Sequence, residues 1–496
     1  MVVKYIMVFL LLGVLIMVSL GTLRKMKSYQ DYNLAGRNTG LFALTATLVA
    51  AEFNTATLIG GASVAFLFGT VGLWYTSLIF IVVFLVYAFT VSKKYRRLNI
   101  STIPQYFDKR FKNEKGSEVI RFLSAIITLF YTWLAPASYL AGLTVIGSVL
   151  LGVNPIIFSV VLVVICLLLS VTGGLMTAIG IDVVAFILIL IGIPAILFIG
   201  YNAAGGFGNL SQVFEPKLLS LAPVWDTDVN IATAMTWGLQ ITFLYIAAPW
   251  YGQRIFSAKS ESVAYKAMLL NTFFIVALYG VVVLATMLSK VVFPNLAYPE
   301  QALPLLINDY ANPFLQGFLL VTLLMVGIST MVAVWNSAVS IIVNDVVSRY
   351  WAKDKGDKYM IRISRLFLFL LAISTLALGI MFIGNIQHSL LFLSTFTGMV
   401  AIPILMSLYW KKYNSIGAIS SMAVGLIYCT LGILLNFPMH YISPIGVVLA
   451  VIAGTIATFA TANDSRYRSN NEEFFEIVES KEKIVEDVQQ VRHVTE

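Results

Sequence analysis

The chain has 496 residues, of which 59% are hydrophobic and 11% are charged. Soluble domains are about half apolar and about a quarter charged, so this composition excludes a soluble globular protein and indicates one that crosses a membrane many times. The formal net charge of +8 does not indicate a nucleic-acid partner, because the basic residues gather in short segments between apolar runs.

Apolar runs long enough to cross a bilayer, about 17 residues or more, predict thirteen membrane helices. In chain order they cover approximately residues 4–23, 41–68, 70–92, 119–151, 154–171, 176–202, 230–255, 265–290, 313–348, 361–383, 387–410, 415–435 and 441–461. They form a membrane domain over residues 1–462, followed by a polar tail over 463–496. Apolar residues recur in the tail near helical spacing, at Phe474, Ile477, Ile484, Val488 and Val491. The tail is therefore either a short amphipathic helix on the cytoplasmic face or a disordered segment.

The distribution of basic residues predicts the orientation of the chain. Except for Lys4, Lys217 and Lys290, all of the 32 Lys and Arg residues fall in loops on one side of the predicted membrane or in the tail. None is expected at mid-membrane. Since loops rich in Lys and Arg stay in the cytoplasm, the N-terminus is expected outside the cell membrane and the C-terminus inside.

Glu52 gives the strongest functional signal, because it lies deep in an apolar segment. A charged side chain at the centre of a membrane helix costs about 2.5–3.5 kcal/mol, so such a residue indicates a functional site. Asn54 and Thr57 follow it, and the pair Gly60-Gly61 predicts that the helix is interrupted between Glu52 and Gly61. Carbonyls freed at such a break, with nearby hydroxyls, suit an alkali cation and a polar solute. The alternative is an ordinary packing helix with small residues at its contacts.

A second interruption is predicted five helices later, at Ala247-Ala248-Pro249-Trp250-Tyr251-Gly252. Transporters built from inverted repeats place such breaks at corresponding positions in each half. We therefore expect two inverted five-helix units, over about 41–202 and about 230–410. Tyr245 and Trp250, on either side of this break, are candidate gating residues of a solute pocket, although aromatic residues in membrane helices also serve packing alone.

A polar pair, Ser329 and Thr330, lies midway along a long apolar helix. Val326 precedes them by three and four residues, so its carbonyl and both hydroxyls share one face of the helix. Neutral oxygens of this kind suit a hard monovalent cation better than a soft metal. Alternatively, each hydroxyl bonds back to its own helix, as is common in membrane segments.

Five motifs occur in a fixed order along the chain between Tyr32 and Tyr413. They are Tyr32-Asn33-Leu34-Ala35-Gly36-Arg37, Thr102-Ile103-Pro104-Gln105-Tyr106 with Lys109-Arg110-Phe111, Gly173-Gly174 followed by Asp182, Gln253-Arg254 with Ala258-Lys259-Ser260, and the helix from Gly317 to Asp345. These motifs resemble those of the sodium:solute symporters, a family that includes proline, sugar, pantothenate and sialic acid carriers.

The resemblance implies an all-helical membrane protein with a LeuT-type fold, in which one helix precedes and two follow a core of ten. It also implies a sodium site made by carbonyls and hydroxyls of the first and eighth core helices. Carried over by position, the sodium ligands are the carbonyls of Ala50, Phe53 and Val326 and the hydroxyls of Ser329 and Thr330.

The chain departs from the family pattern at a second sodium site that some members carry. Asp182 matches the acid of that site, but Val332 and Ala333 stand where its hydroxyl ligands would be. One coupling sodium ion is therefore expected. Asp182, the other acid well inside an apolar segment, then has either a structural hydrogen-bonding role or a role in ion relay.

Glu52 is a further departure, because related carriers have Asp, Asn or Thr at its position. It could attract sodium, bind an ammonium group of the solute, or carry a proton. Asn54 and Thr57 would line the solute pocket, by the resemblance and by their spacing of three residues. The third core helix, around Tyr131, carries no basic anchor for an organic anion, so a neutral, zwitterionic or cationic solute is favoured.

The function implied is sodium-coupled uptake of a small polar organic solute by alternating access. The partners are then the solute, sodium and the lipid bilayer, and the sequence indicates no oligomeric state. Alternatives are a proton-coupled symporter that uses Glu52 and a membrane-embedded solute sensor. An enzyme is not expected, because the three histidines fall in loops or the tail and the two cysteines in apolar runs.

Overall fold

The computed structural model describes residues 2–222, 224–227, 229–353, 355–383, 386–467 and 472–480. These residues form a helical bundle with a single parallel β-bridge, between Thr39 and Ala258. The α-helices are α1 (Val2–Lys25), α2 (Tyr29–Leu34), α3 (Leu41–Glu52), α4 (Ala62–Phe68), α5 (Val71–Leu73), α6 (Ile79–Tyr87), α7 (Lys93–Arg97), α8 (Ile103–Arg110), α9 (Ser117–Leu151), α10 (Pro155–Ala203), α11 (Ile231–Ala247), α12 (Pro249–Ser257), α13 (Glu261–Val292), α14 (Ala302–Tyr310), α15 (Pro313–Ile341), α16 (Asp357–Met381), α17 (Ile386–Tyr409), α18 (Ser415–Leu434), α19 (Met439–Ala460) and α20 (Glu472–Glu479). Short π-helical turns continue them over Thr57–Gly61, Trp74–Leu78, Ala88–Ser92 and Ile342–Trp351, and 3-10 turns cover Ala35–Arg37, Phe207–Gln212, Pro216–Leu219, Pro299–Gln301 and Ser465–Tyr467.

The number of membrane crossings depends on how the bent helices are counted. Among the described residues, 10 helices are long and apolar enough to cross a membrane, or up to 12 if each of two bent pairs is one span. α10 has 49 residues and leaves helical geometry at Gly173 and Gly174. At about 1.5 Å per residue it is far longer than the roughly 30 Å apolar core of a bilayer. Counting its two arms as separate spans recovers the thirteen that the sequence predicts.

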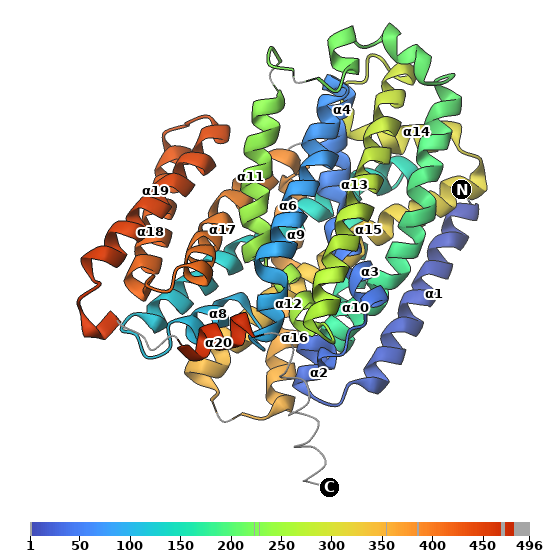
Figure 1. Ribbon diagram of the computed structural model, residues 1–496. Coiled ribbons are helices and arrows are strands. Elements are labelled where there is room, and N and C mark those ends of the chain that lie inside the picture. The colour runs from blue at the N-terminus through green and yellow to red at the C-terminus, as the bar shows by residue number, and fades with distance from the viewer. Residues whose placement is uncertain are drawn as a thin grey trace.

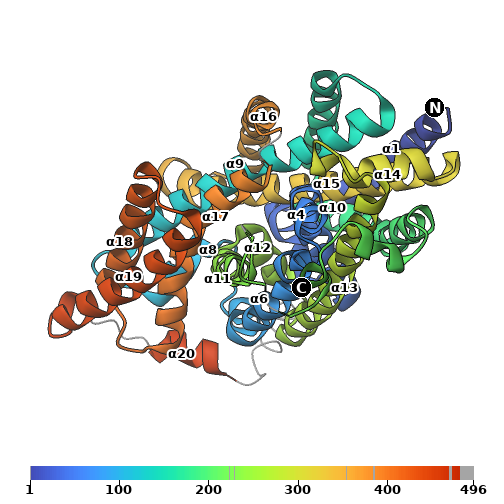
Figure 2. The same ribbon diagram turned by 90° about the horizontal axis from the view of Figure 1, so that it is seen from above.

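The helices are arranged as a central group with a flank on each side (Figures 1 and 2). α3, α9, α10, α13 and α15 pack on one another in the centre, and α1 packs against α10 and α15 at one edge. α18 and α19 lie side by side at the opposite edge and pack mainly against α17, and α18 also contacts α9. The helix at the start of the chain and the last two long helices are thus peripheral to the central group.

The first break in a span begins directly after Glu52. α3 ends there, Phe53 has a non-helical ψ of 81°, and the chain resumes as a helix at an angle of 60°. The break lies within the range Glu52 to Gly61 that the sequence predicts, but the glycine pair does not cause it, because Gly60 and Gly61 both lie inside the continuing helix. Gly61 instead permits close packing, since a Cβ there would lie 2.8 Å from Thr76 Oγ1.

Asn54 satisfies backbone groups on both sides of this break. Its Oδ1 accepts from the Thr57 amide at 2.8 Å, and its Nδ2 donates to the Glu52 carbonyl at 2.7 Å. The Tyr279 hydroxyl of α13 donates to the same carbonyl at 3.0 Å. Because an unsatisfied backbone group in the membrane interior costs several kcal/mol, these bonds make the irregular geometry tolerable.

The second break separates α11 from α12, which are bent by 49° at Ala248. Ala248 has extended geometry with ψ of 115°, and Pro249 opens α12. Proline fits the first position of a helix because it has no amide hydrogen to leave unbonded. This break lies where the sequence predicts it.

Two arginines of the sequence motifs hold loop carbonyls at the basic end of the bundle. Arg37 donates to the carbonyls of Asn99, Ile100 and Phe256. Burial and the charge of Arg96 lower its pKa to about 10, which still leaves it protonated at neutral pH. Arg110 is fully buried and donates to the carbonyls of Ser407, Trp410, Lys411 and Tyr413, beyond and within the last turn of α17.

The sequence analysis missed three short helices, α2, α8 and α14. All are too short to produce an apolar run of membrane length. Of the two alternatives for the tail, a short helix is present as α20 (Figure 1). Its Phe474 and Val478 are buried beside α8 and α7. The other tail residues of the predicted pattern, Ile484, Val488 and Val491, lie outside the described residues.

Candidate functional site

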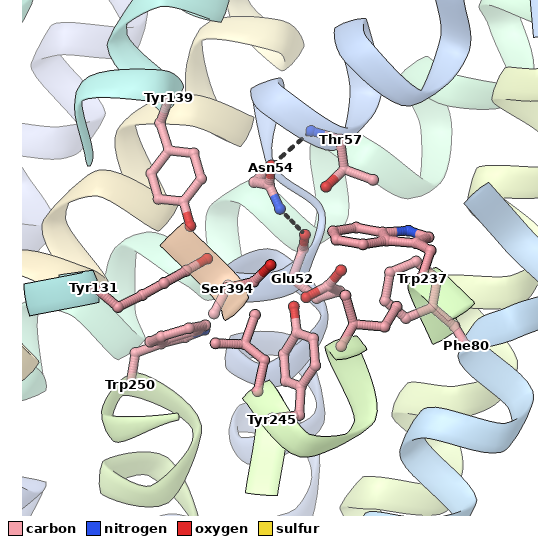
Figure 3. Close-up of a pocket in the computed structure, with 13 residues that line it drawn as sticks. Glu52, Asn54, Thr57, Phe80, Tyr131, Tyr139, Trp237, Tyr245, Trp250 and Ser394 are labelled. Carbon is pink, nitrogen blue, oxygen red and sulfur yellow. Dashed lines mark hydrogen bonds between the residues drawn. The ribbon is translucent and has the colours of Figure 1, made fainter. Parts of the chain in front are cut away.

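The two broken spans meet at a cavity. From the first break it is lined by Glu52, Asn54 and Thr57, and from the second by Tyr245 and Trp250 (Figure 3). The structure thus brings together all five residues that the sequence predicts for a solute pocket. Their roles in binding stay a prediction.

The Glu52 side chain reaches into this cavity from the last residue of α3 (Figure 3). Only 1% of the residue is exposed, and its Oε2 has no hydrogen-bond partner in the described structure. No ion pair within the described residues involves Glu52. A buried carboxylate oxygen without a partner is costly unless a ligand or water satisfies it.

Of the predicted sodium ligands, Ala50 lies in the last turn of α3, two residues before Glu52, and Val326, Ser329 and Thr330 lie across from it on α15. Ser329 Oγ and Thr330 Oγ1 each lie 3.2 Å from the Ala50 carbonyl oxygen, and 3.3 and 3.0 Å from the carbonyl oxygen of Val326. All four residues are fully buried. The break after Glu52 deprives the Ala50 carbonyl of its helical partner, so it is available to these hydroxyls.

This group of oxygens fits an alkali cation. Carbonyl and hydroxyl oxygens are hard, neutral ligands, and the C-terminal end of α3 adds the negative end of its helix dipole. Among the described residues no group of three or more His, Cys, Asp or Glu side chains could hold a metal. Phe53, the fifth predicted ligand, follows α3 directly, and its ring stacks on Tyr279 at 4.6 Å.

Asp182 forms a buried ion pair that the sequence did not reveal. Its Oδ2 lies 2.8 Å from Arg254 Nη2, and neither side chain is exposed. Thr47, three residues before Ala50, donates to the same Oδ2 and accepts from Arg254 Nε at 2.8 Å. Arg254, which the sequence predicts in an inner loop, is instead buried in the last turn of α12.

Sequence reasoning also missed much of the cavity wall. Phe80, Tyr139, Trp237 and Ser394 line it together with Tyr131 (Figure 3). Tyr131 stacks on Trp250 with ring centroids 5.1 Å apart, and Tyr245 meets Trp250 edge-on at 6.1 Å. These residues come from helices α6, α9, α11 and α17. The sequence alone does not distinguish these residues from those of ordinary apolar spans, because only the packing of the helices places them at the cavity.

A model of the sodium:solute symporter family matches residues 32–425 of the chain. The chain belongs to this family. It is therefore a multi-pass membrane transporter and not an enzyme, and it is a sodium-coupled solute symporter. This confirms the resemblance drawn from its motifs.

Curated relatives of the symporter carry different solutes. It is 26% identical over 452 residues to the sodium/glucose cotransporter of Vibrio parahaemolyticus, an alignment that covers 83% of this chain and 80% of that protein. It is 24% identical over 472 residues to the osmoregulated proline transporter OpuE of Bacillus subtilis (strain 168), covering 89% of this chain and 92% of that protein.

Solved structures of similar shape confirm the LeuT-type fold of the symporter. A sodium-coupled sialic acid symporter in a substrate-bound outward-open state superimposes with a TM-score of 0.78 at 17% identity, covering 92% of this chain and 98% of that one. Mhp1, a nucleobase-cation-symport-1 family transporter in a closed conformation, gives a TM-score of 0.54 at 14% identity, covering 90% and 98%. Both likenesses concern the fold alone.

Proposed function

We propose that the symporter takes up its solute by binding one sodium ion between α3 and α15 and the solute in the cavity beside it. The ion is held by the carbonyls of Ala50, Phe53 and Val326 and the hydroxyls of Ser329 and Thr330. The observation that supports this most directly is the approach of both hydroxyls to the Ala50 carbonyl at 3.2 Å.

Sodium binding and solute binding then share the end of one helix. Ala50 and Glu52 are two residues apart in the last turn of α3, so an ion that joins Ala50 to α15 also fixes the position of Glu52 in the cavity. Sodium favours the state in which α3 and α15 are held together, and its release lets them separate. Alternating access follows from the difference in ion affinity between the two states.

A single sodium ion per cycle is supported by the surroundings of Asp182. Its charge is already paired with Arg254, and Val332 and Ala333 offer no hydroxyl. One ion is sufficient for accumulation. A potential of about 100 mV supplies roughly 2.3 kcal/mol per charge and a tenfold sodium gradient about 1.4 kcal/mol, which together support on the order of 500-fold accumulation.

The orientation proposed is N-terminus outside and C-terminus in the cytoplasm. Its support is the gathering of Lys and Arg in the loops at one end of the bundle, with only Lys4, Lys217 and Lys290 elsewhere. The inward direction of sodium movement and the inward electric field then drive uptake. The two inverted units, over about 41–202 and 230–410, remain part of the proposal.

The test compares two serines on α15. We expect Ser329→Ala to raise the sodium concentration that half-stabilises the purified symporter at least about tenfold, the loss expected when one ligand is removed at a cost of about 1.4 kcal/mol. Ser337 is the matched control, because it is equally buried on the same helix but donates to its own helix, to the Val334 carbonyl at 2.8 Å. Ser337→Ala should leave the sodium dependence unchanged.

The measurement is the shift in thermal unfolding midpoint over a sodium titration, with potassium keeping the ionic strength constant. Transport in proteoliposomes should show a Hill coefficient near one for sodium. An unchanged sodium dependence in both Ser329→Ala and Thr330→Val would refute the site. A coefficient close to two would refute the single-ion stoichiometry.

A further inference from the structure

One acidic side chain and no basic one are found among the described residues that line the solute cavity. Glu52 is the only charged residue among the described residues that line it. Its Oε2 is buried without a hydrogen-bond partner in the described structure, while the side-chain amide of Asn54 beside it bonds to the Glu52 carbonyl and the Thr57 backbone amide. A ligand that enters this cavity therefore meets an unpaired carboxylate.

Aromatic side chains surround that carboxyl group (Figure 3). Among the described residues that line the cavity, six are aromatic: Phe80, Tyr131, Tyr139, Trp237, Tyr245 and Trp250. Each aromatic face carries a negative electrostatic potential that attracts a cation, most strongly for tryptophan, and rings grouped around a carboxylate are the usual surroundings of bound ammonium groups.

The same surroundings are unfavourable for the other solute classes. A zwitterion could place its ammonium group against Glu52, but its carboxylate would find no basic side chain, because no Lys, Arg or His is present among the described lining residues. A sugar carries no cationic group, so it would leave the Glu52 carboxyl group without a charged partner. A small cation satisfies Glu52 and leaves its apolar part in contact with the rings.

We infer that the solute of the symporter is a small organic cation, whose ammonium group is held between the Glu52 carboxylate and the ring faces of Tyr131, Tyr245 and Trp250. This inference rests on the proposed function, since it places the solute in the cavity beside the sodium site. It narrows the solute from polar molecules in general to amines and quaternary ammonium compounds.

The first test needs only the wild-type symporter and two probes of the same shape. Choline carries a trimethylammonium group, and 3,3-dimethylbutan-1-ol carries a neutral tert-butyl group in its place. Binding is measured in saturating sodium by the change in tryptophan fluorescence, because Trp237 and Trp250 line the cavity. We expect choline to bind at least about tenfold more tightly than the alcohol, and more tightly than proline or glucose.

Two substitutions separate the charge from the rings. Glu52→Gln should bring the affinities for choline and the alcohol to within a few-fold of each other, and Trp250→Leu should weaken choline binding more than alcohol binding. Glu114 provides the matched control for the charge change, because it is also buried but bonds to the Ser415 amide at 2.7 Å, away from the cavity. Glu114→Gln should keep the preference for choline.

A sodium titration of the wild type distinguishes the two levels of the proposal. If sodium stabilises the symporter but choline binds no better than the alcohol, proline or glucose, the cationic solute is overturned and the sodium site stands. If sodium does not stabilise it, the proposed function fails as well. A preference for choline that survives in Glu52→Gln would overturn the pairing with Glu52.

Discussion

The Asp182–Arg254 pair allows a prediction that separates a structural acid from an ion-relaying one. The two groups lie 2.8 Å apart, and neither side chain is exposed. At an effective dielectric constant of about 20, their attraction is on the order of 6 kcal/mol. Much of this is offset by the desolvation of both charges. Removing one charge leaves the other buried without a partner, so Asp182→Asn alone or Arg254→Gln alone should destabilise the protein by about 3–5 kcal/mol.

The double variant Asp182→Asn/Arg254→Gln should regain most of that loss, because no unpaired charge remains and both amides can bond to Thr47. The assay is the thermal unfolding midpoint of the four proteins in the same detergent, arranged as a double-mutant cycle. Sodium titrations of the same four proteins then test the role in transport. A structural pair predicts that the double variant keeps the wild-type sodium dependence.

Two results would refute this reasoning. If the effects of the single variants simply add in the double variant, the two residues are not coupled. If the double variant is stable but its sodium affinity falls tenfold or more, Asp182 belongs to the ion path and the single-ion site is incomplete.

Two further predictions concern packing. Gly61→Ala should lower the unfolding midpoint, with a cost of about 1–3 kcal/mol, because the added Cβ would lie 2.8 Å from Thr76 Oγ1. Adding Thr76→Ala to the same chain should recover part of the lost stability. If it recovers none, the close contact between the two residues is contradicted. Phe474→Ala should detach α20 and speed its cleavage in limited proteolysis, because Phe474 is only 4% exposed. The exposed Glu476→Ala serves as control, and equal cleavage of the two variants would contradict the docking of α20.

The sequence predicted the parts of the site that break the rules of a membrane helix. Glu52 is a charge in an apolar run and Pro249 a helix breaker, so both mark interrupted spans without any knowledge of packing. Tyr245 and Trp250 were predicted from their place beside the second break, and Asn54 and Thr57 from the family resemblance and their spacing of three residues. The break after α3 lies in the predicted range, but the bonds of Asn54 stabilise it, rather than the flexibility of the glycine pair.

The remaining wall could not be predicted because lipid-facing and cavity-facing aromatic residues have the same chemistry. Phe80 and Phe89 lie in one span, Val71–Arg97, yet Phe80 is 2% exposed and lines the cavity, whereas Phe89 is 65% exposed. The partner of Asp182 was hidden for a similar reason. Arg254 stands close to the end of its span in a basic stretch, and only the bend at Ala248 turns it into the bundle.

The geometry of α3 also explains how a positive ion and a positive solute could assist each other rather than repel. Both would bind near the C-terminal end of the same helix, where the helix dipole is negative, and Glu52 lies two residues after Ala50. An ionised Glu52 offsets the repulsion between the two cations, so each makes the other easier to bind, and by linkage the factor is the same in both directions. Glu52→Gln should therefore reduce this mutual factor as well as the affinity for choline. A neutral solute would not require the carboxylate for coupling. The sodium dependence of choline binding in Glu52→Gln therefore measures directly how much Glu52 contributes to the coupling between sodium and the solute.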